Sequence, residues 1–381
     1  MTAHQVTVSP TGSLRELART LQAQGRDVVN LTAGELSMPT PQHIVDAAIV
    51  AAQDPSRHGY GNAAGDPELR DAINGWAARS LGIRADRAQI AVTNGAKQAL
   101  HNALRSLVGP GDEVIVPAPY WVTFPEAIRL AGATPVFAYP REGHVLPDAA
   151  DLDAARTPAT RAVIVCSPHN PTGAVHDDAE LEQIVQWAAG HRIWVISDDT
   201  YRDLRFTDIR STPRAALDAG CDVVSIGSTS KSHAMTGWRT GWLIAPPEIT
   251  ATAIAIQSHT SSNVSRVSQA AALAALTGPD VATETRRELR SLRDELMGIL
   301  SDAGISFPAP EGAFYLFPPA PANGALDDTE LAGRLLEDSG VAVVPGAAFG
   351  APGHVRVSYA GAAVAVMDGV RRLAAALGAG R

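Results

Sequence analysis

The chain has 381 residues, of which 45% are hydrophobic and 19% charged, and its formal net charge is −9. This composition is typical of a soluble globular protein with about two domains, and the negative charge leaves no basic surface for nucleic acid or an anionic membrane. No apolar stretch is long enough to span a bilayer, and no secretory signal opens the chain. The two cysteines, Cys166 and Cys221, form no zinc-like cluster, so the sequence favours a reduced cytoplasmic protein without a metal site.

Short β-branched runs alternate with helical stretches between about Ala88 and Pro246. The predicted strands are QIAVT, EVIVP, AVIVCSP, IWVIS, VVSIGS and GWLIA, at 89–93, 113–117, 162–168, 193–197, 223–228 and 241–245. The segments between them, such as AKQALHNALRSLV, repeat apolar residues at helical spacing. Apolar strands separated by helices predict an α/β fold with a mostly parallel sheet covered on both faces. In such sheets, binding sites form at the carboxyl ends of the strands.

The two ends of the chain differ from this middle region. Both contain helical segments and turns rich in Pro and Gly, and the C-terminal end adds short strands within ISFPA, AFYLFP and VRVSYA. We expect a large domain over residues 46–280 and a smaller α+β domain built from residues 1–45 and 281–381. A segment rich in Arg, Glu and Leu, from Thr283 to Leu300, predicts a long helix that joins the two domains.

A lysine lies in the segment SIGSTSKSHAMTGWRTGW (225–242), and eight further motifs accompany it along nearly the whole chain. They are LTAGE (31–35), GYGNAAGDPELRDAI (59–73), VTNGAKQAL (92–100), PAPYW (117–121), SPHNPTG (167–173), SDDTY (197–201), EGAFYLFP (311–318) and VRVSYA (355–360). In this order they resemble the motifs of class I/II aminotransferases, the aspartate-aminotransferase-like branch of the fold-type I pyridoxal-phosphate (PLP) enzymes. The resemblance implies a three-layer large domain with a mostly parallel sheet, a smaller α+β domain, and PLP as the cofactor.

The same resemblance implies that Lys231 binds PLP as a Schiff base. A free lysine has a pKa of about 10.4 and is inert at neutral pH, whereas desolvation and neighbouring positive charge lower that pKa. Asp198 matches the aspartate that keeps the pyridine nitrogen protonated, so that the ring can accept electrons, and Asp199 is its rival for this role. Tyr201 and Asn170 match the pair that hydrogen-bonds the phenolic oxygen of the cofactor. We therefore expect Lys231, Asp198 and Tyr201 to be catalytic.

The phosphate group of such a cofactor needs N–H donors and positive charge. The sequence TNGAK turns from a strand into a helix, so Ala96 and Lys97 are expected to present backbone N–H groups at a helix N-terminus. Ser228 and Arg239 match the hydroxyl and the guanidinium of the family's phosphate site, where the planar fork of arginine can bind two oxygens. By the same resemblance, Tyr60 reaches a phosphate in the partner subunit, which predicts a homodimer with shared active sites.

Residues that contact the substrate also follow from the resemblance. Trp121 matches the aromatic residue that stacks on the cofactor ring, and Arg356 matches the arginine that binds the substrate α-carboxylate. The backbone of Gly34 and the side chain of Asn170 are expected to contact the substrate at the same end of the site. The resemblance further implies cis peptide bonds before Pro119 and Pro171.

Several positions depart from the family pattern. GELSM (34–38) stands where relatives usually read G-E-P-D-F, and GYGN (59–62) stands where they commonly read K-Y-T-P. His233 replaces an aromatic residue, either as a substrate contact or as a filler of that space. By analogy these positions lie near the mouth of the pocket, so the sequence leaves the identity of the amino-acid donor open.

The resemblance implies an aminotransferase that moves the amino group of an L-amino acid to a 2-oxo acid, with the freed Lys231 amine as the proton shuttle at the substrate Cα. The same scaffold also serves β- or γ-elimination, oxidation and cyclisation of amino acids, and the site residues do not exclude these reactions. A non-catalytic PLP-binding regulatory module is a third alternative. Such modules usually carry a DNA-binding appendage, and the sequence contains no basic domain.

Overall fold

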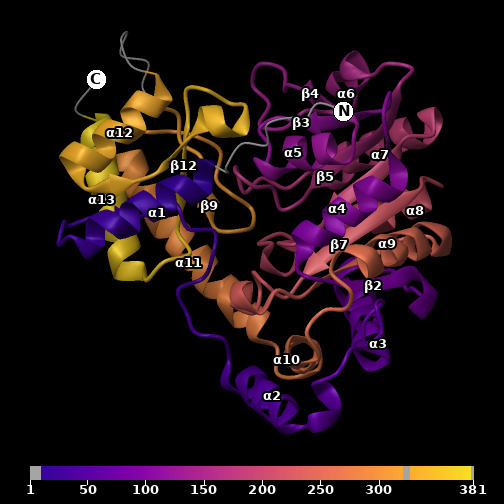
Figure 1. Cartoon of the computed structure of the whole chain (residues 1–381). Coiled ribbons are helices and arrows are strands. Elements are labelled where there is room, and N and C mark those ends of the chain that lie inside the picture. Colours follow the sequence, from indigo (N-terminus) through magenta and orange to yellow (C-terminus); the bar gives the residue numbers. More distant parts are fainter. Residues whose placement is uncertain (1–9, 321–326, 379–381) are drawn as a thin grey trace.

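A seven-stranded sheet forms the centre of the larger part of the molecule, in the order β2-β8-β7-β6-β5-β3-β4. The computed structural model describes residues 10–320 and 327–378 (Figure 1). The strands of this sheet are β2 (Ile90–Thr93), β3 (Glu113–Pro117), β4 (Thr134–Ala138), β5 (Thr160–Cys166), β6 (Trp194–Asp198), β7 (Val223–Ser228) and β8 (Gly241–Ile244). Strands β3 to β7 run parallel, and β8 pairs antiparallel with β2 and β7. The predicted mostly parallel sheet is confirmed.

The seventh strand, β4, is absent from the sequence-based prediction. It lies at the edge of the sheet and pairs with β3 alone. Thr134 is exposed, the next three residues are only partly buried, and Pro135 interrupts the series of backbone N–H groups. A short edge strand with a proline carries a weaker apolar signal than the buried central strands, which explains why the pattern missed it.

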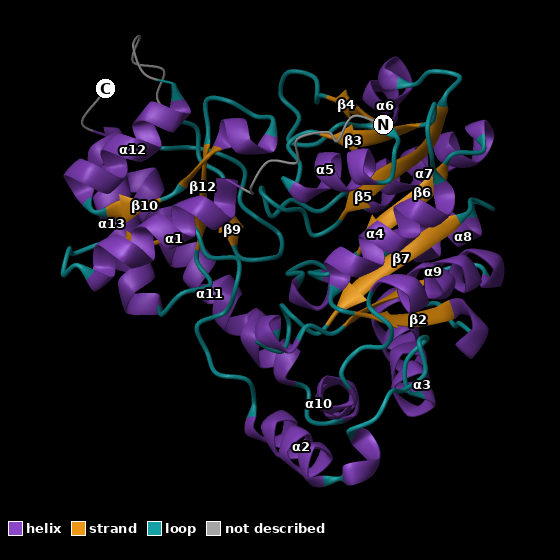
Figure 2. Ribbon diagram, viewed as in Figure 1, coloured by secondary structure: helices purple, strands orange, loops and turns teal. Residues whose placement is uncertain are grey.

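Helices cover both faces of this sheet and make it the middle of three layers (Figure 2). One face is covered by α4 (Ala96–Leu107), α5 (Thr123–Leu130) and α9 (Pro247–Thr260), and the other by α6 (Ala149–Ala155), α7 (Asp178–His191) and α8 (Thr212–Asp218). Because successive strand residues point to opposite faces, Val114 and Val116 of β3 belong to the first of these cores while Ile115 belongs to the second. The predicted α/β architecture is therefore confirmed.

A further group of helices flanks the β2 end of the sheet. It consists of α2 (Gln42–Gln53), α3 (Pro67–Trp76) and α10 (Arg266–Thr277), and α10 packs against the other two. A single π-helical turn, Ala77–Leu81, extends α3. Within residues 10–320 and 327–378, every helix is too short or too polar to cross a lipid bilayer.

The smaller part combines residues from the two ends of the chain. Strand β1 (Val29–Asn30) pairs in parallel with β10 (Val341–Ala342), and a second small sheet joins β11 (Val344–Pro345), β12 (Val355–Ser358) and β9 (Tyr315–Leu316). The surrounding helices are α1 (Pro10–Ala23), α11 (Val281–Asp302), α12 (Asp328–Ser339) and α13 (Ala363–Gly378). Accordingly, Ala18 of the indigo α1 packs with Leu336 of α12 (Figure 1). The predicted long helix is confirmed as α11, whereas the domain boundaries at 45/46 and 280/281 stay predictions.

Two peptide bonds before proline are cis. One joins Ala118 to Pro119, as expected, and the other joins Ser167 to Pro168. The expectation for Pro171 is therefore wrong, because the cis bond lies three residues earlier, directly after β5.

Candidate active site

A cavity of about 380 Å³ lies where the carboxyl ends of the parallel strands face the smaller part of the molecule. Eleven of the twelve residues predicted for the site line it: Gly34, Ala96, Lys97, Trp121, Asn170, Asp198, Tyr201, Ser228, Lys231, Arg239 and Arg356. The twelfth, Tyr60, does not. Its side chain is 92% exposed, on the loop before α3. The structure thus brings together residues from the whole length of the chain.

Lys231 follows β7 and projects its amine into the cavity. Nζ donates a hydrogen bond to the carbonyl oxygen of Gly34 and lies 5.9 Å from the centre of the Tyr201 ring. Burial, followed by the positive charge of Arg356, lowers the pKa of Lys231 to about 8, while Glu35 opposes this shift. A much larger fraction of this amine is therefore neutral at physiological pH than in a solvated lysine, which is the state that a nucleophilic lysine requires.

Asp198 and Asp199 face different surroundings, which separates the two rivals. Asp198 ends β6 and lines the cavity, and its Oδ1 accepts hydrogen bonds from Thr200 Oγ1 at 2.6 Å and from the Thr200 N–H at 3.1 Å. Asp199 instead accepts hydrogen bonds from Ser197 and Ser225 and is absent from the cavity wall. Burial raises the pKa of both carboxyl groups, that of Asp199 to about 7. Of the two, only Asp198 is placed to meet a ligand.

Tyr201 and Asn170 are buried on neighbouring loops after β6 and β5. The Tyr201 hydroxyl lies 2.7 Å from the hydroxyl of Tyr315, a residue for which the sequence analysis predicted no role. Asn170 Oδ1 accepts a hydrogen bond of 3.1 Å from Nη1 of Arg356. Burial, with Tyr315 as the next cause, raises the pKa of Tyr201 well above its usual value, so this hydroxyl stays protonated.

Arg356 is a buried cation on β12. Its Nη2 donates to the carbonyl oxygen of Thr32 at 2.9 Å, and its guanidinium lies 4.6 Å from the Tyr315 ring and 4.8 Å from the Phe349 ring. Within residues 10–320 and 327–378, no carboxylate pairs with it, and its Nε has no hydrogen-bond partner. A buried, unpaired guanidinium is costly, and an anionic ligand in the cavity would offset that cost.

The opposite end of the cavity is built to bind an anion. Helix α4 begins at Ala96, where the first N–H groups of a helix have no partner within it, and Gly95 makes no side-chain cap there. Arg239 lies so close that a Cβ on Gly95 would be 2.5 Å from Nη2 of Arg239. Ser228, at the end of β7, exchanges hydrogen bonds with Ser230 and places a hydroxyl at the same end. Backbone donors, hydroxyl and guanidinium together suit a phosphate.

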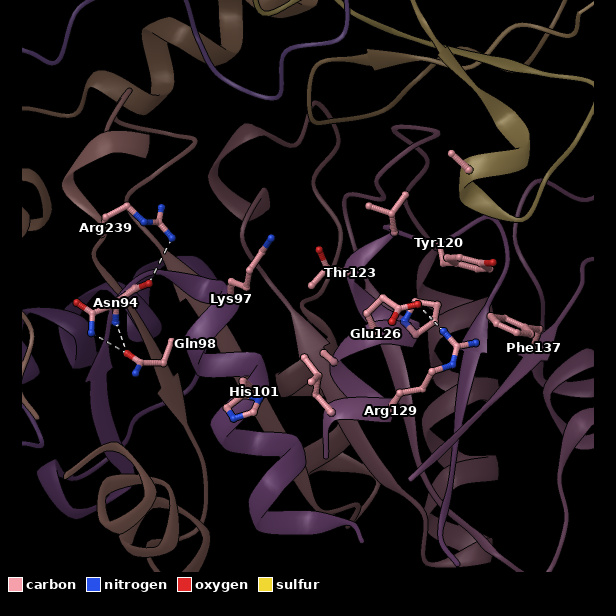
Figure 3. Close-up of a pocket in the computed structure, with 15 residues that line it drawn as sticks. Asn94, Lys97, Gln98, His101, Tyr120, Thr123, Glu126, Arg129, Phe137 and Arg239 are labelled. Atoms are coloured by element: carbon pink, nitrogen blue, oxygen red, sulfur yellow. Dashed lines mark hydrogen bonds and ion pairs between the residues drawn. The ribbon is translucent and has the colours of Figure 1, made fainter. Parts of the chain in front are cut away.

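A second cavity, of about 690 Å³, opens beside the first and shares Lys97 and Arg239 with it. Figure 3 shows both side chains at one end of this cavity, with α4 on one side and Thr123 and Glu126 of α5 on the other. The Lys97 ammonium lies 5.2 Å from the centre of the Trp121 ring. Burial, and after it Arg239, lowers the pKa of Lys97. No acidic side chain pairs with Lys97 in the part of the chain that the structure describes.

Several residues that line the first cavity were not predicted for it. They are Gly12, Arg15, Thr32, Glu35, Thr200, Ser230, Thr236 and Tyr315. Glu35 accepts hydrogen bonds from Arg15 at 3.3 Å and from the Thr236 hydroxyl at 3.0 Å, so it ties α1 to the segment that follows Lys231. Glu35, Thr200 and Ser230 are direct neighbours of predicted residues, and that adjacency was the available signal for them. Nothing in the sequence marked Arg15.

The residue types at the cavity match the functional groups of PLP one by one. An aldehyde needs an amine, a ring nitrogen needs a carboxylate, and a phenolic oxygen needs a hydroxyl or amide donor. A phosphate needs N–H donors and positive charge, which lie at the α4 end of the cavity. Lys231, Asp198 and Tyr201 supply the first three of these groups. Among the described residues, no cluster of His, Cys, Asp or Glu could hold a metal ion.

Comparisons with known proteins agree with this geometry. The family model for aminotransferase class I and II matches residues 26–373. The aspartate aminotransferase of Streptomyces avermitilis is 41% identical over 97% of this chain and 93% of its own length, and the aspartate/prephenate aminotransferase of Cereibacter sphaeroides is 41% identical over 98% and 97%. The solved structure of aspartate aminotransferase from Thermus thermophilus with maleate superposes with a TM-score of 0.91, at 37% identity and 97% coverage of both chains.

Such identity over nearly the full length of relatives shows the family as well as the fold. Fold alone would leave the reaction open, but the relatives are aminotransferases, and Lys231 of this chain lies in its cavity. The chain therefore belongs to the aminotransferase class I and II family and is a fold-type I, PLP-dependent aminotransferase, which transfers an amino group from an amino acid to a 2-oxo acid.

Proposed function

We propose that this aminotransferase takes its amino group from an acidic L-amino acid, with L-aspartate as the preferred donor. The observation that carries the proposal is a pair of cations in the cavity of Lys231 without carboxylate partners among the described residues: the buried Arg356, for the α-carboxylate, and Lys97. An α-carboxylate placed against Arg356 would bring the substrate Cα toward that amine. The names of relatives from Streptomyces avermitilis and Cereibacter sphaeroides support aspartate as the donor.

PLP, when bound, supplies an aldehyde for the amino group and a ring that withdraws electrons from the Cα–H bond. In our proposal Lys231 holds the cofactor covalently and then, once its amine is free, moves the proton from Cα. Asp198 keeps the ring nitrogen protonated, and Tyr201 and Asn170 donate hydrogen bonds to the phenolic oxygen. Trp121, at the wall of the cavity, would stack on the ring and exclude water from one face of it.

The phosphate end has its own set of residues in this proposal. The backbone N–H groups of Ala96 and Lys97, the Ser228 hydroxyl and the Arg239 guanidinium bind the phosphate oxygens. The helix dipole of α4 also favours negative charge at this position, so these residues would hold the cofactor by its phosphate. Gly34 completes the substrate end with its backbone.

The Lys97 side chain is our candidate for the second carboxylate of the donor. It is a cation at the wall of the cavity, and it has no acidic partner among the described residues. A hydrogen bond between charged groups is worth about 1.5–3 kcal/mol, which corresponds to a factor of roughly 10 to 100 in affinity. That range is sufficient to separate aspartate from a donor with an apolar side chain.

The test compares aspartate with alanine as donor in the wild-type enzyme and in Lys97→Met, which keeps the backbone N–H. We expect kcat/KM for aspartate to fall roughly 10- to 100-fold in the variant while that for alanine changes less than about twofold. Arg105→Met is the matched control, because Arg105 lies on the same helix, is exposed and does not line the cavity. A wild-type enzyme that prefers alanine would refute the acidic donor and leave amino transfer intact.

We further propose a homodimer in which each cofactor phosphate is reached by Tyr60 of the partner subunit. Two observations support this arrangement. Tyr60 is an exposed aromatic side chain without a site of its own, and Arg239 at the phosphate end is exposed and also lines the second cavity. A second copy of the chain would cover both, and Ile49 and Val50 of α2 are additional exposed apolar side chains for such a contact.

We also propose that the enzyme works in the cytoplasm. Its two cysteines, Cys166 and Cys221, are both buried and unpaired with each other, as is usual for proteins of a reducing compartment. Fractionation of source cells with an antibody to the protein would test this location, and recovery outside the cytoplasmic fraction would refute it.

A further inference from the structure

The hydroxyl groups of Tyr201 and Tyr315 form a pair that bridges the two parts of the molecule. Tyr201 follows β6 of the large sheet, whereas Tyr315 belongs to β9 of the small antiparallel sheet. Both side chains are buried, and their hydroxyl oxygens lie 2.7 Å apart. In the small sheet, β9 pairs with β12, so Tyr315 lies beside the strand that carries Arg356.

Tyr315 contacts residues of both halves of the proposed site. Its ring lies 4.6 Å beneath the Arg356 guanidinium carbon, and a Cβ on Gly34 would be 3.0 Å from its hydroxyl oxygen. Its hydroxyl meets Tyr201. The buried Tyr315 side chain therefore contacts Arg356, the proposed carboxylate-binding residue. It also contacts Gly34, whose carbonyl oxygen accepts a hydrogen bond from the Lys231 amine, and Tyr201, the proposed donor to the phenolic oxygen.

A count of protons fixes the direction of the hydrogen bond between the two tyrosines. Each hydroxyl carries one proton and can donate one hydrogen bond. If Tyr201 gives its proton to the phenolic oxygen of the cofactor, it can only accept from Tyr315. The Tyr315 proton must then point at Tyr201. A hydroxyl that accepts a hydrogen bond becomes a stronger donor itself, because hydrogen bonds in a chain polarise one another.

We propose that Tyr315 is a positioning residue: its hydroxyl aims and strengthens the hydrogen bond that Tyr201 donates to the cofactor, while its ring holds the plane of the Arg356 guanidinium. The proposal rests on the functions proposed above for Tyr201 and Arg356. It assigns two separable tasks to one side chain. The hydroxyl acts on the cofactor, and the ring acts on the substrate carboxylate through the cation–π contact.

Tyr315→Phe removes the hydroxyl and keeps the ring. In our proposal Tyr201 donates a hydrogen bond to the phenolic oxygen of the cofactor. That oxygen carries negative charge when the imine nitrogen of the lysine–cofactor linkage is unprotonated, so a weaker donor destabilises the unprotonated linkage. We therefore expect the pKa of the linkage, read from the pH dependence of its absorbance without substrate, to rise by about half a unit. The KM for the amino donor should change less than about twofold, because the ring contact with Arg356 remains.

Tyr359→Phe is the matched control. Tyr359 is a buried tyrosine next to the same strands, and its hydroxyl donates to the carbonyl oxygen of Ala313 at 3.4 Å, outside the cavity. This variant loses a buried hydroxyl as well, yet the pKa of the linkage should stay at the wild-type value. An equal rise in the two variants would assign the effect to loosened packing and overturn the proposal.

Tyr315→Leu removes the ring as well. We expect the same rise in the pKa of the linkage and, in addition, a rise of about threefold to tenfold in the KM for aspartate, since the cation–π contact that orients Arg356 is lost. A Tyr315→Phe enzyme with an unchanged absorbance titration would refute Tyr315 as a positioning residue while the proposed function stands. A wild-type protein that never develops the absorbance of the linkage would instead refute the proposed chemistry of Lys231.

Discussion

The neutral fraction of the Lys231 amine governs how fast the cofactor-free enzyme captures PLP. Burial and Arg356 lower the pKa of this group to about 8, against about 10.4 for a free lysine. At pH 7 a group with a pKa of 8 is neutral in about one molecule in ten, and a free lysine in about one in 2,500. The cavity therefore raises the concentration of reactive amine by roughly 200-fold.

The assay mixes cofactor-free enzyme with a low concentration of PLP and follows the absorbance of the covalent linkage from pH 6 to pH 10. We expect the capture rate to rise about tenfold per pH unit and to level off near pH 8. Two variants should move this inflection in opposite directions. Arg356→Gln removes a positive charge that lowers the pKa of Lys231, so the inflection moves up, whereas Glu35→Gln removes a charge that raises it, so the inflection moves down.

The lowered pKa of Lys231 also makes the free energy of unfolding depend on pH. Because the pKa of Lys231 is lower in the folded than in the unfolded protein, the unfolded state binds more protons between pH 8 and about pH 10.4, and the contribution of this group to stability rises with pH across that window. Lys231→Ala should lose this rise.

An inflection of the capture rate near pH 10, or one that Arg356→Gln leaves in place, would refute the account of how the cavity tunes Lys231.

Two further predictions concern the phosphate end of the site. Gly95→Ala places a Cβ 2.5 Å from Nη2 of Arg239, at a residue whose φ of +78° already disfavours a side chain. We therefore expect the Kd for PLP to rise at least about tenfold. Gly109→Ala is the control and should bind PLP normally, because a Cβ there meets nothing within 4 Å. If Tyr60 acts across the dimer, inactive Tyr60→Ala and Lys231→Ala chains should recover about a quarter of wild-type activity when they are mixed and reassembled. Half of the dimers are then hybrids, and each hybrid holds one complete site out of two. No recovery would place Tyr60 in its own subunit's site or in none.

The residues that follow the large sheet could be predicted because the physics of parallel sheets places them together. Asp198 and Ser228 end buried apolar strands, Lys231 follows the second of these strands, and the carboxyl ends of such strands meet at one edge. The structure also separates Asp198 from Asp199, since neighbouring residues at a strand end point in different directions. Local sequence was sufficient to place these residues at that edge, because strand and turn are local properties, whereas their roles were implied by the resemblance to the family.

Residues of the smaller part were harder to predict because their positions depend on long-range pairing. Tyr315 lies in the motif EGAFYLFP, where an aromatic residue between apolar neighbours has the pattern of a core residue. Only the pairing of β9 with β12 places it beside Arg356. Arg15 is a polar residue on an amphipathic helix, and it reaches the cavity because the chain that follows α1 pairs with β10. No spacing within residues 10–23 carries that information.

The contacts of residues 32–34 indicate how substrate binding can change the base that the reaction needs. The carbonyl oxygen of Thr32 accepts from Arg356, and that of Gly34 accepts from Lys231, so one short segment holds two cations in one cavity. Each charge disfavours the other, which is why Arg356 lowers the pKa of Lys231. In our proposal the substrate carboxylate neutralises Arg356, and the pKa of the freed Lys231 amine must then rise. The amine is thus nucleophilic when the cofactor-free enzyme captures PLP, and more basic once a proton has to be taken from Cα.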